Sequence, residues 1–239
     1  MLSSTEAMRL EALQTAIGYT FRDIDLLSNA LTHSSFANEA TSKGEDTKSN
    51  ERLEFLGDSV LSLVISRYLF EEYPSLSEGE LSKIRAQTVC EKTLASFARK
   101  ISLGHYLMLG HGETQNKGNE RDSILADAFE ALLAAIYLDS SLQEVKTFLL
   151  PYAAEQIREI LETHHTMDYK TMLQQIVQQS NGVILDYCII SERGPAHRRV
   201  FEVEARLDGN IIGKGTGSSK REAEQNAAKV GLSYFGITE

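Results

Sequence analysis

The sequence predicts an all-α domain followed by a small α+β domain of order α-β-β-β-α. Apolar residues recur at helical spacing through the first two thirds of the 239 residues, and no alternating strand pattern is present before residue 182. Beyond residue 168, three short alternating runs lie between two amphipathic segments. The polar stretch 163–167 separates the helical pattern from the pattern of alternating strands. We therefore expect it to link domains at 8–162 and 168–237.

The elements of the all-α domain are predicted from apolar periodicity and from start and stop signals. Gly18 closes the first helix, Asn50 is the expected N-cap of the third, and Pro74 stops that helix. Ser77 and Glu80 have the spacing of a capping box. Helices are expected at 10–17, 25–31, 50–73, 77–99 (continuous or broken once), 123–138 and 142–161, with polar loops at 37–50 and 111–120.

The α+β domain is predicted because the spacing of apolar residues changes near residue 180 from the helical period to the alternation of a strand. A Gln-rich amphipathic helix is expected first, and an Ala-rich helix closes the domain. Asp208-Gly209 is a strong hairpin signal between the last two strands. The predicted helices are 169–180 and 219–234, and the predicted strands are 183–191, 200–207 and 211–215, which gives a small sheet with both helices on one face.

Composition narrows the class of protein. The two cysteines, Cys90 and Cys188, are far apart, so neither a disulfide framework nor a zinc spacing is present and a cytoplasmic location is expected. No window has the length of uncharged apolar sequence that a membrane helix needs, so no membrane partner is expected. Net charge is −10, and all of it falls within residues 1–167, because the remaining 72 residues hold nine basic and nine acidic side chains. The acidic total therefore does not exclude nucleic acid binding by the second domain.

Two groups of acidic residues are the most informative feature of the first domain. Glu51, Glu54 and Asp58 are spaced three and four apart, which places them on one stripe of a helix. Asp127 and Glu130 lie three apart inside an apolar run, where charge is costly. Like charges so placed repel, and a divalent cation would turn the repulsion into attraction. Solvated acids on helix faces are the alternative interpretation, and it applies to Glu51 in particular.

Packed against each other, the two helices would place four carboxylates around one cavity. No His lies at ligand spacing to them, which argues against zinc or a di-iron site. Carboxylate oxygens with bound water suit Mg²⁺, with Mn²⁺ as a substitute. Such a site suits phosphodiester hydrolysis, because the metal lowers the pKa of the attacking water and stabilises the leaving oxygen.

Three segments resemble the ribonuclease III family. The segment 50–61 (Asn-Glu-Arg-Leu-Glu-Phe-Leu-Gly-Asp-Ser-Val-Leu) resembles its signature, and 121–132 (Arg-Asp-Ser-Ile-Leu-Ala-Asp-Ala-Phe-Glu-Ala-Leu) resembles its second acidic motif. The segment 31–35 (Leu-Thr-His-Ser-Ser) resembles the family's N-terminal region, and the likeness spans most of residues 8–160. The resemblance implies an all-α endonuclease domain. It also implies a homodimer through that domain, whose two sites cut opposite strands of double-stranded RNA, leaving 5′-phosphate and 3′-hydroxyl ends with short 3′ overhangs.

The resemblance also implies roles for single residues. Glu54, Asp58, Asp127 and Glu130 match the carboxylates that hold Mg²⁺ and drive cleavage, and Asp58 and Glu130 are the strongest candidates for catalysis. Glu51 and Glu78 match acidic positions near the RNA, although a first-turn acid favoured by the helix dipole explains Glu78 as well. Phe55 matches a residue that packs into the second subunit, with an ordinary core Phe as the alternative. Ribosomal precursor and messenger RNA processing are the implied roles.

The second domain resembles the double-stranded RNA-binding domain in its element order, its Gly-Pro-x-His turn and its segment 215–224. Duplex RNA hides its base edges, so it is recognised through shape, 2′-hydroxyls and phosphates. Neutral side chains on the first helix would reach a minor groove, and basic residues with free N–H groups at the start of the last helix would reach a phosphate. A solubilising helix face and simple N-capping are the alternatives. The candidate RNA-binding residues are Thr171, Gln174, Gln175, Gln178, His197, Ser218, Ser219, Lys220 and Arg221.

Three functional hypotheses follow. The first is a Mg²⁺-dependent endoribonuclease specific for double-stranded RNA. The second is a non-catalytic RNA-binding protein that keeps the nuclease fold as a dimer scaffold, which is disfavoured because all four carboxylates are present. The third is a carboxylate-bridged metal oxidase, which fails because the Glu-x-x-His motifs of such proteins are missing.

Overall fold

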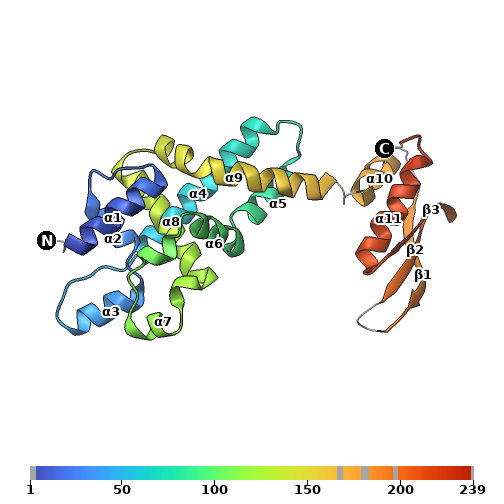
Figure 1. Cartoon of the computed structure of the whole chain (residues 1–239). Helices are drawn as coiled ribbons and strands as arrows, with labels where there is room; N and C mark the ends of the chain where they lie inside the picture. Colours follow the sequence, from blue (N-terminus) through green and yellow to red (C-terminus); the bar gives the residue numbers. More distant parts are fainter. Residues whose placement is uncertain (1–3, 166–168, 179–182, 196–198, 238–239) are drawn as a thin grey trace. The chain divides into compact units, whose positions relative to one another are not determined.

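The fold was analysed in a computed structural model that describes residues 4–165, 169–178, 183–195 and 199–237 (Figure 1). The chain forms two compact units, Met1–Ile160 and Leu161–Glu239. The first unit is helical, and the second holds a three-stranded antiparallel sheet with two helices. The predicted fold class is therefore confirmed. None of the helices in the described parts of the chain is both long and apolar enough to cross a membrane.

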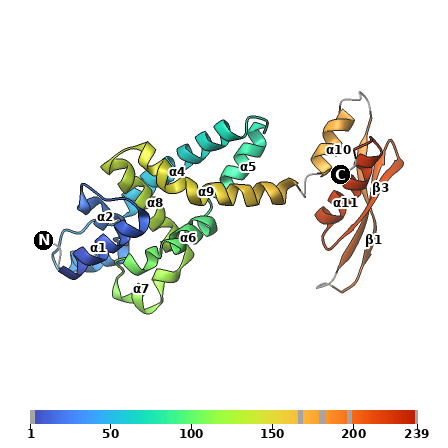
Figure 2. The same ribbon diagram turned by 45° about the horizontal axis from the view of Figure 1, so that its top comes forward.

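The helical unit is built around one buried helix, α8 (Asp122–Asp139), which packs against α2, α4 and α6 (Figure 2). Most of its side chains are buried on every side, as expected for a helix at the centre of a domain. The other elements of the unit are α1 (Ser4–Ile17), α2 (Ile24–Ala30), α3 (Ser34–Ser42), α4 (Glu51–Glu72), α5 (Glu78–Thr88), α6 (Glu91–Lys100), η1 (Leu103–Tyr106), α7 (His111–Gln115), η2 (Gly118–Glu120) and α9 (Leu142–His165).

Asp139 ties the end of α8 to the turn before α2. Its carboxylate accepts a hydrogen bond from the Tyr19 hydroxyl at 2.6 Å and from the backbone N–H groups of Arg22 at 3.0 Å and Asp23 at 2.7 Å. Burial by itself would raise the pKa of Asp139, but these hydrogen bonds and the Arg22 charge outweigh it, and the pKa is lowered. The ionised form of this buried acid is thus part of the packing of the unit.

Three local predictions for the helical unit need correction. Residues 37–42 belong to α3 rather than to a loop, because Ala37 and Ala40 are buried three apart on one face of a helix. The loop predicted at 111–120 contains the short helices α7 and η2. Asn50 precedes α4 but makes no side-chain cap; its Nδ2 donates to the carbonyl oxygen of Ala30 instead. The capping box of Ser77 and Glu80 and the break between α5 and α6 are confirmed.

In the second unit, β1 (Leu185–Arg193), β2 (Val200–Leu207) and β3 (Asn210–Gly217) form a sheet in sequence order between α10 (Tyr169–Gln178) and α11 (Lys220–Ser233). Its core joins apolar side chains of both helices to those of β2 and β3. Asp208 and Gly209 both have positive φ, 47° and 82°, as the predicted hairpin turn requires. A Cβ on Gly213 would lie 2.2 Å from the Ala227 carbonyl oxygen, so glycine is needed where α11 crosses β3.

Candidate active site

Gly57 brings the two acidic segments together. It lies in α4, and a Cβ on it would stand only 2.0 Å from the carbonyl oxygen of Glu130 in α8. The backbones of α4 and α8 can therefore approach this closely only because residue 57 has no side chain. Glu54 and Asp58 flank Gly57 in sequence, and Asp127 precedes Glu130 by one turn, so all four candidate carboxylates lie along this crossing.

The charges of the four carboxylates act on one another across the two helices. Burial raises the pKa of Glu130 to about 8, and the charges of Asp58, Glu54 and Asp127 add to the rise. Burial also raises the pKa of Glu54, with contributions from Asp127 and Glu51. Asp58 is exposed, whereas the other three are half-buried. The structure thus brings together all four residues that sequence reasoning singled out.

The donor set suits a hard divalent cation. Carboxylate oxygen is the ligand that Mg²⁺ prefers. Burial, and after it the charges of the neighbouring carboxylates, raise the pKa of Glu130, and a cation would relieve that repulsion. Among the described residues, no three acidic, imidazole or thiol side chains are already arranged as ligands around one point. The cluster therefore fits a cation by its chemistry, although its carboxylates are not already gathered around one point.

Two further titratable residues, which sequence reasoning missed, act on the cluster. Burial raises the pKa of Asp127, the charge of Glu91 adds to this, and His33 opposes it. Glu91 is the first residue of α6, and His33 is the N-cap of α3. No helical spacing connects either residue to α4 or α8. The position of His33 within the segment 31–35 was the one available signal.

The two other acidic candidates, Glu51 and Glu78, differ in their position relative to the four carboxylates. Glu51 is exposed beside Glu54 and accepts a hydrogen bond from the Ser49 hydroxyl at 2.9 Å. Glu78 lies in the first turn of α5, where its carboxylate accepts from the Ser82 hydroxyl at 2.8 Å. Within the described residues, nothing connects Glu78 to the four carboxylates. The structure therefore favours the helix-dipole explanation for Glu78 in a single chain.

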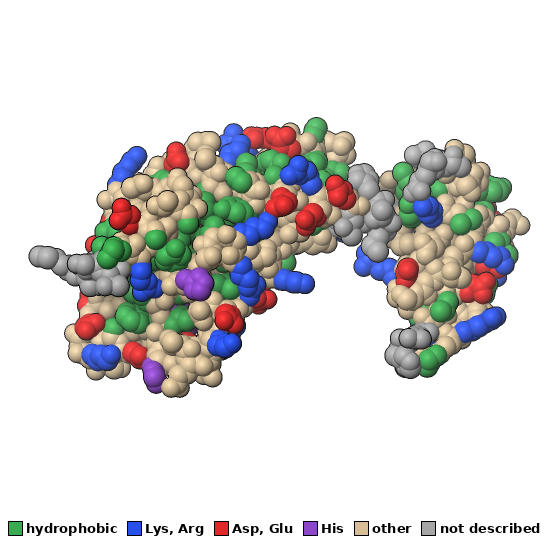
Figure 3. Space-filling model, in the orientation of Figure 1, with side chains coloured by type: hydrophobic (Ala, Val, Ile, Leu, Met, Phe, Trp, Pro, Cys, Tyr) green, Lys and Arg blue, Asp and Glu red, His purple; other side chains and the backbone are tan. Residues whose placement is uncertain are grey.

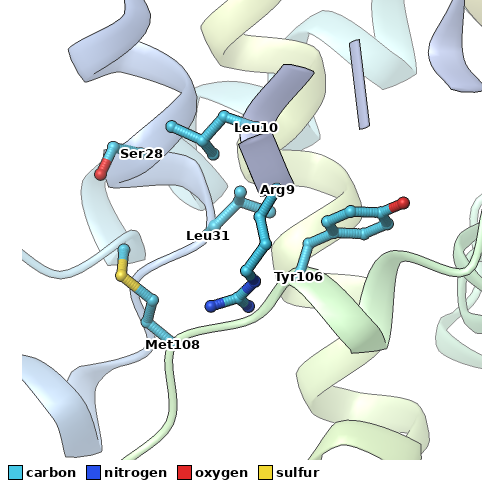
Figure 4. A pocket seen from close by; sticks show the side chains of 6 residues that line it. All are labelled: Arg9, Leu10, Ser28, Leu31, Tyr106 and Met108. Carbon is cyan, nitrogen blue, oxygen red and sulfur yellow. The ribbon is translucent and has the colours of Figure 1, made fainter. Parts of the chain in front are cut away.

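Two pockets in the helical unit are lined by none of the four carboxylates. One, of about 10 Å³, is lined by Arg9, Leu10, Ser28, Leu31, Tyr106 and Met108 (Figure 4). Arg9 crosses it and donates to the carbonyl oxygen of His105 at 3.1 Å. A space of that size holds about one water molecule. This small space is therefore not a candidate site for a substrate.

The candidate RNA-binding residues lie on two elements of the second unit. On α10, Thr171, Gln175 and Gln178 are exposed and Gln174 is half-buried. At α11, Ser219 is the N-cap, and its hydroxyl accepts from the Glu222 N–H at 3.2 Å. Lys220 and Arg221 are exposed, and the Lys220 ammonium lies 5.9 Å from the centre of the Phe201 ring. His197 lies outside the described residues.

Glu222 occupies donors at the start of α11 that were predicted to be free for phosphate. Its carboxylate accepts from the Ser218 backbone N–H at 2.7 Å and from the Ser218 hydroxyl at 2.6 Å. These hydrogen bonds lower the pKa of Glu222. On the face of the second unit seen in Figure 3, basic side chains alternate with acidic ones and form no continuous basic patch.

Comparison with known proteins identifies a family for each of the two units. Residues 23–157 match the family described as Ribonuclease-III-like, and residues 169–234 match the double-stranded RNA binding motif. The chain is 44% identical to Ribonuclease 3 of Listeria welshimeri over 94% of its length and 97% of the relative's. It is 50% identical to Ribonuclease 3 of Caldanaerobacter subterraneus subsp. tengcongensis over 95% of its length and 99% of the relative's.

A solved structure extends the likeness to the helical unit. The nuclease domain of ribonuclease III from Campylobacter jejuni is 41% identical, with a TM-score of 0.56, over 62% of this chain and 97% of that one. That structure was described as showing structural flexibility in the region involved in dimer formation of the nuclease domain. Taken with the family matches over both units, this likeness shows that the chain belongs to the ribonuclease III family and carries a double-stranded RNA-binding domain after its nuclease domain.

Proposed function

We propose that this protein is an endoribonuclease that hydrolyses phosphodiester bonds of double-stranded RNA with Mg²⁺, or with Mn²⁺ in its place. The observation that carries the proposal is the crossing at Gly57, where four carboxylates from α4 and α8 share one electrostatic site. The products would be 5′-phosphate and 3′-hydroxyl ends with short 3′ overhangs, as the family resemblance implies. Structured ribosomal precursors and messenger RNA are the proposed substrates.

The four acidic side chains have distinct parts in this proposal. Glu54, Asp58, Asp127 and Glu130 would hold the cation, which lowers the pKa of a water and stabilises the leaving oxygen. Glu130, with its pKa near 8, is mostly protonated at neutral pH before binding and gives up that proton when it becomes a ligand. Asp58 is exposed, so it lies at the side of the cluster that faces solvent and an approaching substrate.

RNA would be recognised by shape and charge rather than by sequence. The exposed polar residues of α10, among them Thr171 and Gln175, present neutral hydrogen-bonding groups of the kind that contact a minor groove. Lys220 and Arg221 supply positive charge for a phosphate. Because Glu222 already occupies the Ser218 donors, we expect modest affinity that falls as salt rises.

A second copy of the chain is the proposed partner of α4. Phe55, Leu63 and Phe70 are 79%, 55% and 74% exposed, and their spacing places them along one face of this helix. Large apolar side chains aligned in this way mark a contact surface. Phe55→Asp should therefore shift the protein from dimer to monomer in sedimentation. An unchanged sedimentation coefficient would argue against this surface.

The decisive experiment compares wild type with Glu130→Gln on a long labelled RNA duplex, with Mg²⁺ or with chelator. Glu155→Gln is a matched control, since Glu155 is an exposed acid paired with Lys100 at 2.5 Å, away from the cluster. We expect wild type and the control to cut only with Mg²⁺, and Glu130→Gln to bind duplex in a gel shift without cutting it. If no protein cuts with any metal while all bind duplex, the non-catalytic scaffold is the correct reading.

A further inference from the structure

A pocket of about 150 Å³ lies between α4 and α9, which run side by side in both ribbon views (Figures 1 and 2). That volume holds about five water molecules at ~30 Å³ each, and it is about half the volume of the smallest pockets that take drug-sized ligands. The pocket therefore suits a small ion or one chemical group of a larger molecule. Its lining consists of Val64, Arg67, Tyr68, Leu142, Gln143 and Lys146.

The Lys146 ammonium lines this pocket with hydrogen-bond donors that lack an acceptor. Its side chain is 33% exposed, and its ion-pair partner Glu71 lies 3.8 Å away, which is too far for a hydrogen bond. In the described parts of the chain, no other carboxylate and no carbonyl oxygen accepts from it. A largely buried ammonium is costly unless its N–H groups are hydrogen-bonded, so Lys146 needs an acceptor, and the pocket is where one can bind.

Arg67 adds a second cation to the same lining. Its Nε donates to the Glu71 carboxylate at 2.7 Å, and within the ranges that the structure describes the N–H donors of its Nη atoms have no acceptor. Tyr68 and Gln143 contribute further polar groups that can donate, and none of the lining residues is acidic. Two cations without a carboxylate in one lining favour a bound anion.

We propose that the pocket between α4 and α9 binds a phosphate group. A phosphate monoester carries a charge of about −1.5 to −2 near neutral pH and three strong acceptor oxygens, so it matches two cations better than chloride or a carboxylate does. Arg67 would donate to its oxygens through a planar guanidinium, and Lys146 would act as a point charge. The group belongs either to free phosphate or to the 5′ end of an RNA strand. Because the acidic cluster takes no part in it, this proposal does not depend on the proposed function.

Calorimetric titration of the full-length protein with inorganic phosphate tests the proposal. The buffer contains chelator, so that no divalent cation on the acidic cluster holds the phosphate, and sodium chloride keeps the ionic strength constant. Arg67→Gln and Lys146→Gln each remove one cation from the lining. Lys100→Gln is the matched control, because it removes the same charge from an exposed pair with Glu155 that does not line the pocket. Glu71→Gln removes the carboxylate that competes with phosphate for both cations.

We expect wild type and Lys100→Gln to bind phosphate saturably and with equal affinity, and Arg67→Gln and Lys146→Gln to bind it about 10-fold more weakly. Glu71→Gln should bind phosphate about 3-fold more tightly, which a purely structural role of these ion pairs does not predict. Absence of saturable binding by wild type, or equal affinity of wild type and Lys146→Gln, would overturn the proposal. So would an equal loss in Lys100→Gln, because affinity would then follow net charge.

A competition experiment distinguishes the two sources of the phosphate group. If the pocket takes the end of a strand, an RNA duplex with 5′-phosphate ends displaces bound phosphate, and the same duplex with 5′-hydroxyl ends does not. If neither duplex displaces it, the ligand is free phosphate.

Discussion

Gly57→Ala tests whether the close crossing of α4 and α8 builds the site. The new Cβ would stand 2.0 Å from the Glu130 carbonyl oxygen, about 1.4 Å closer than the 3.4 Å at which ordinary van der Waals contact begins. Overpacking costs about 1–3 kcal/mol, and the upper end applies here because the obstacle is backbone. Removing a mid-helix glycine returns about 0.5–1 kcal/mol, which leaves a net loss of about 2 kcal/mol.

The same displacement should cost activity. Moving α4 by about 1 Å separates Asp58 from Glu130, and a misplacement of that size reduces turnover about 100-fold. Urea unfolding followed by helical circular dichroism measures the first effect, and single-turnover duplex cleavage measures the second. Gly79→Ala is the matched control. Gly79 lies in α5 with no atom within 4 Å of its built Cβ, so it should gain stability and keep full activity. Wild-type stability and cleavage in Gly57→Ala would refute the reasoning.

Three further predictions concern single side chains. Asp139→Asn should lower the free energy of unfolding by about 2–3 kcal/mol at neutral pH, because an amide cannot accept all three hydrogen bonds. Since the folded-state pKa of Asp139 lies below the unfolded one, this difference should shrink in urea titrations as pH falls through the lowered pKa. Tyr187→Phe should raise the free energy of unfolding by about 1 kcal/mol, because the Tyr187 hydroxyl is buried without a hydrogen-bond partner among the described residues. A lower free energy of unfolding in chemical denaturation would contradict this. With chelator present, the free energy of unfolding of Glu130→Gln should rise relative to that of wild type by about 1–2 kcal/mol between about pH 5 and about pH 9. The reason is that the pKa of Glu130 is higher in the folded than in the unfolded protein, so wild type loses stability as this acid ionises. A difference that does not change with pH would contradict the raised pKa.

Local patterns predicted most of the fold. Apolar periodicity located α4 and α8 to within one or two residues, and the Asp208-Gly209 pair predicted the hairpin turn. The errors arose where tertiary contacts decide the local structure. Asn50 had the composition of an N-cap, yet its side chain reaches the end of α2, because a carbonyl oxygen there offered a buried partner.

The candidate site was predictable only in part, for a related reason. Spacing within one helix predicted which acids share a face, and the apolar surroundings of Asp127 and Glu130 indicated burial. The contribution of His33 depends on an irregular segment brought to α4 by one backbone hydrogen bond, for which sequence spacing carries no signal. The hydrogen bonds from Ser218 to Glu222 also depend on where α11 begins.

Glu222 gives the second unit a built-in substitute for its own ligand. A carboxylate that accepts from a backbone N–H and a serine hydroxyl at the start of a helix makes the contacts that a phosphate oxygen would make there. An RNA phosphate bound at Ser218, as proposed above, would have to displace this carboxylate, which would return when the RNA dissociates. Such self-occupancy would lower the affinity for RNA, because the hydrogen bonds from Ser218 to Glu222 stabilise the free state, and a modest affinity suits a protein that must leave one duplex before it can act on the next.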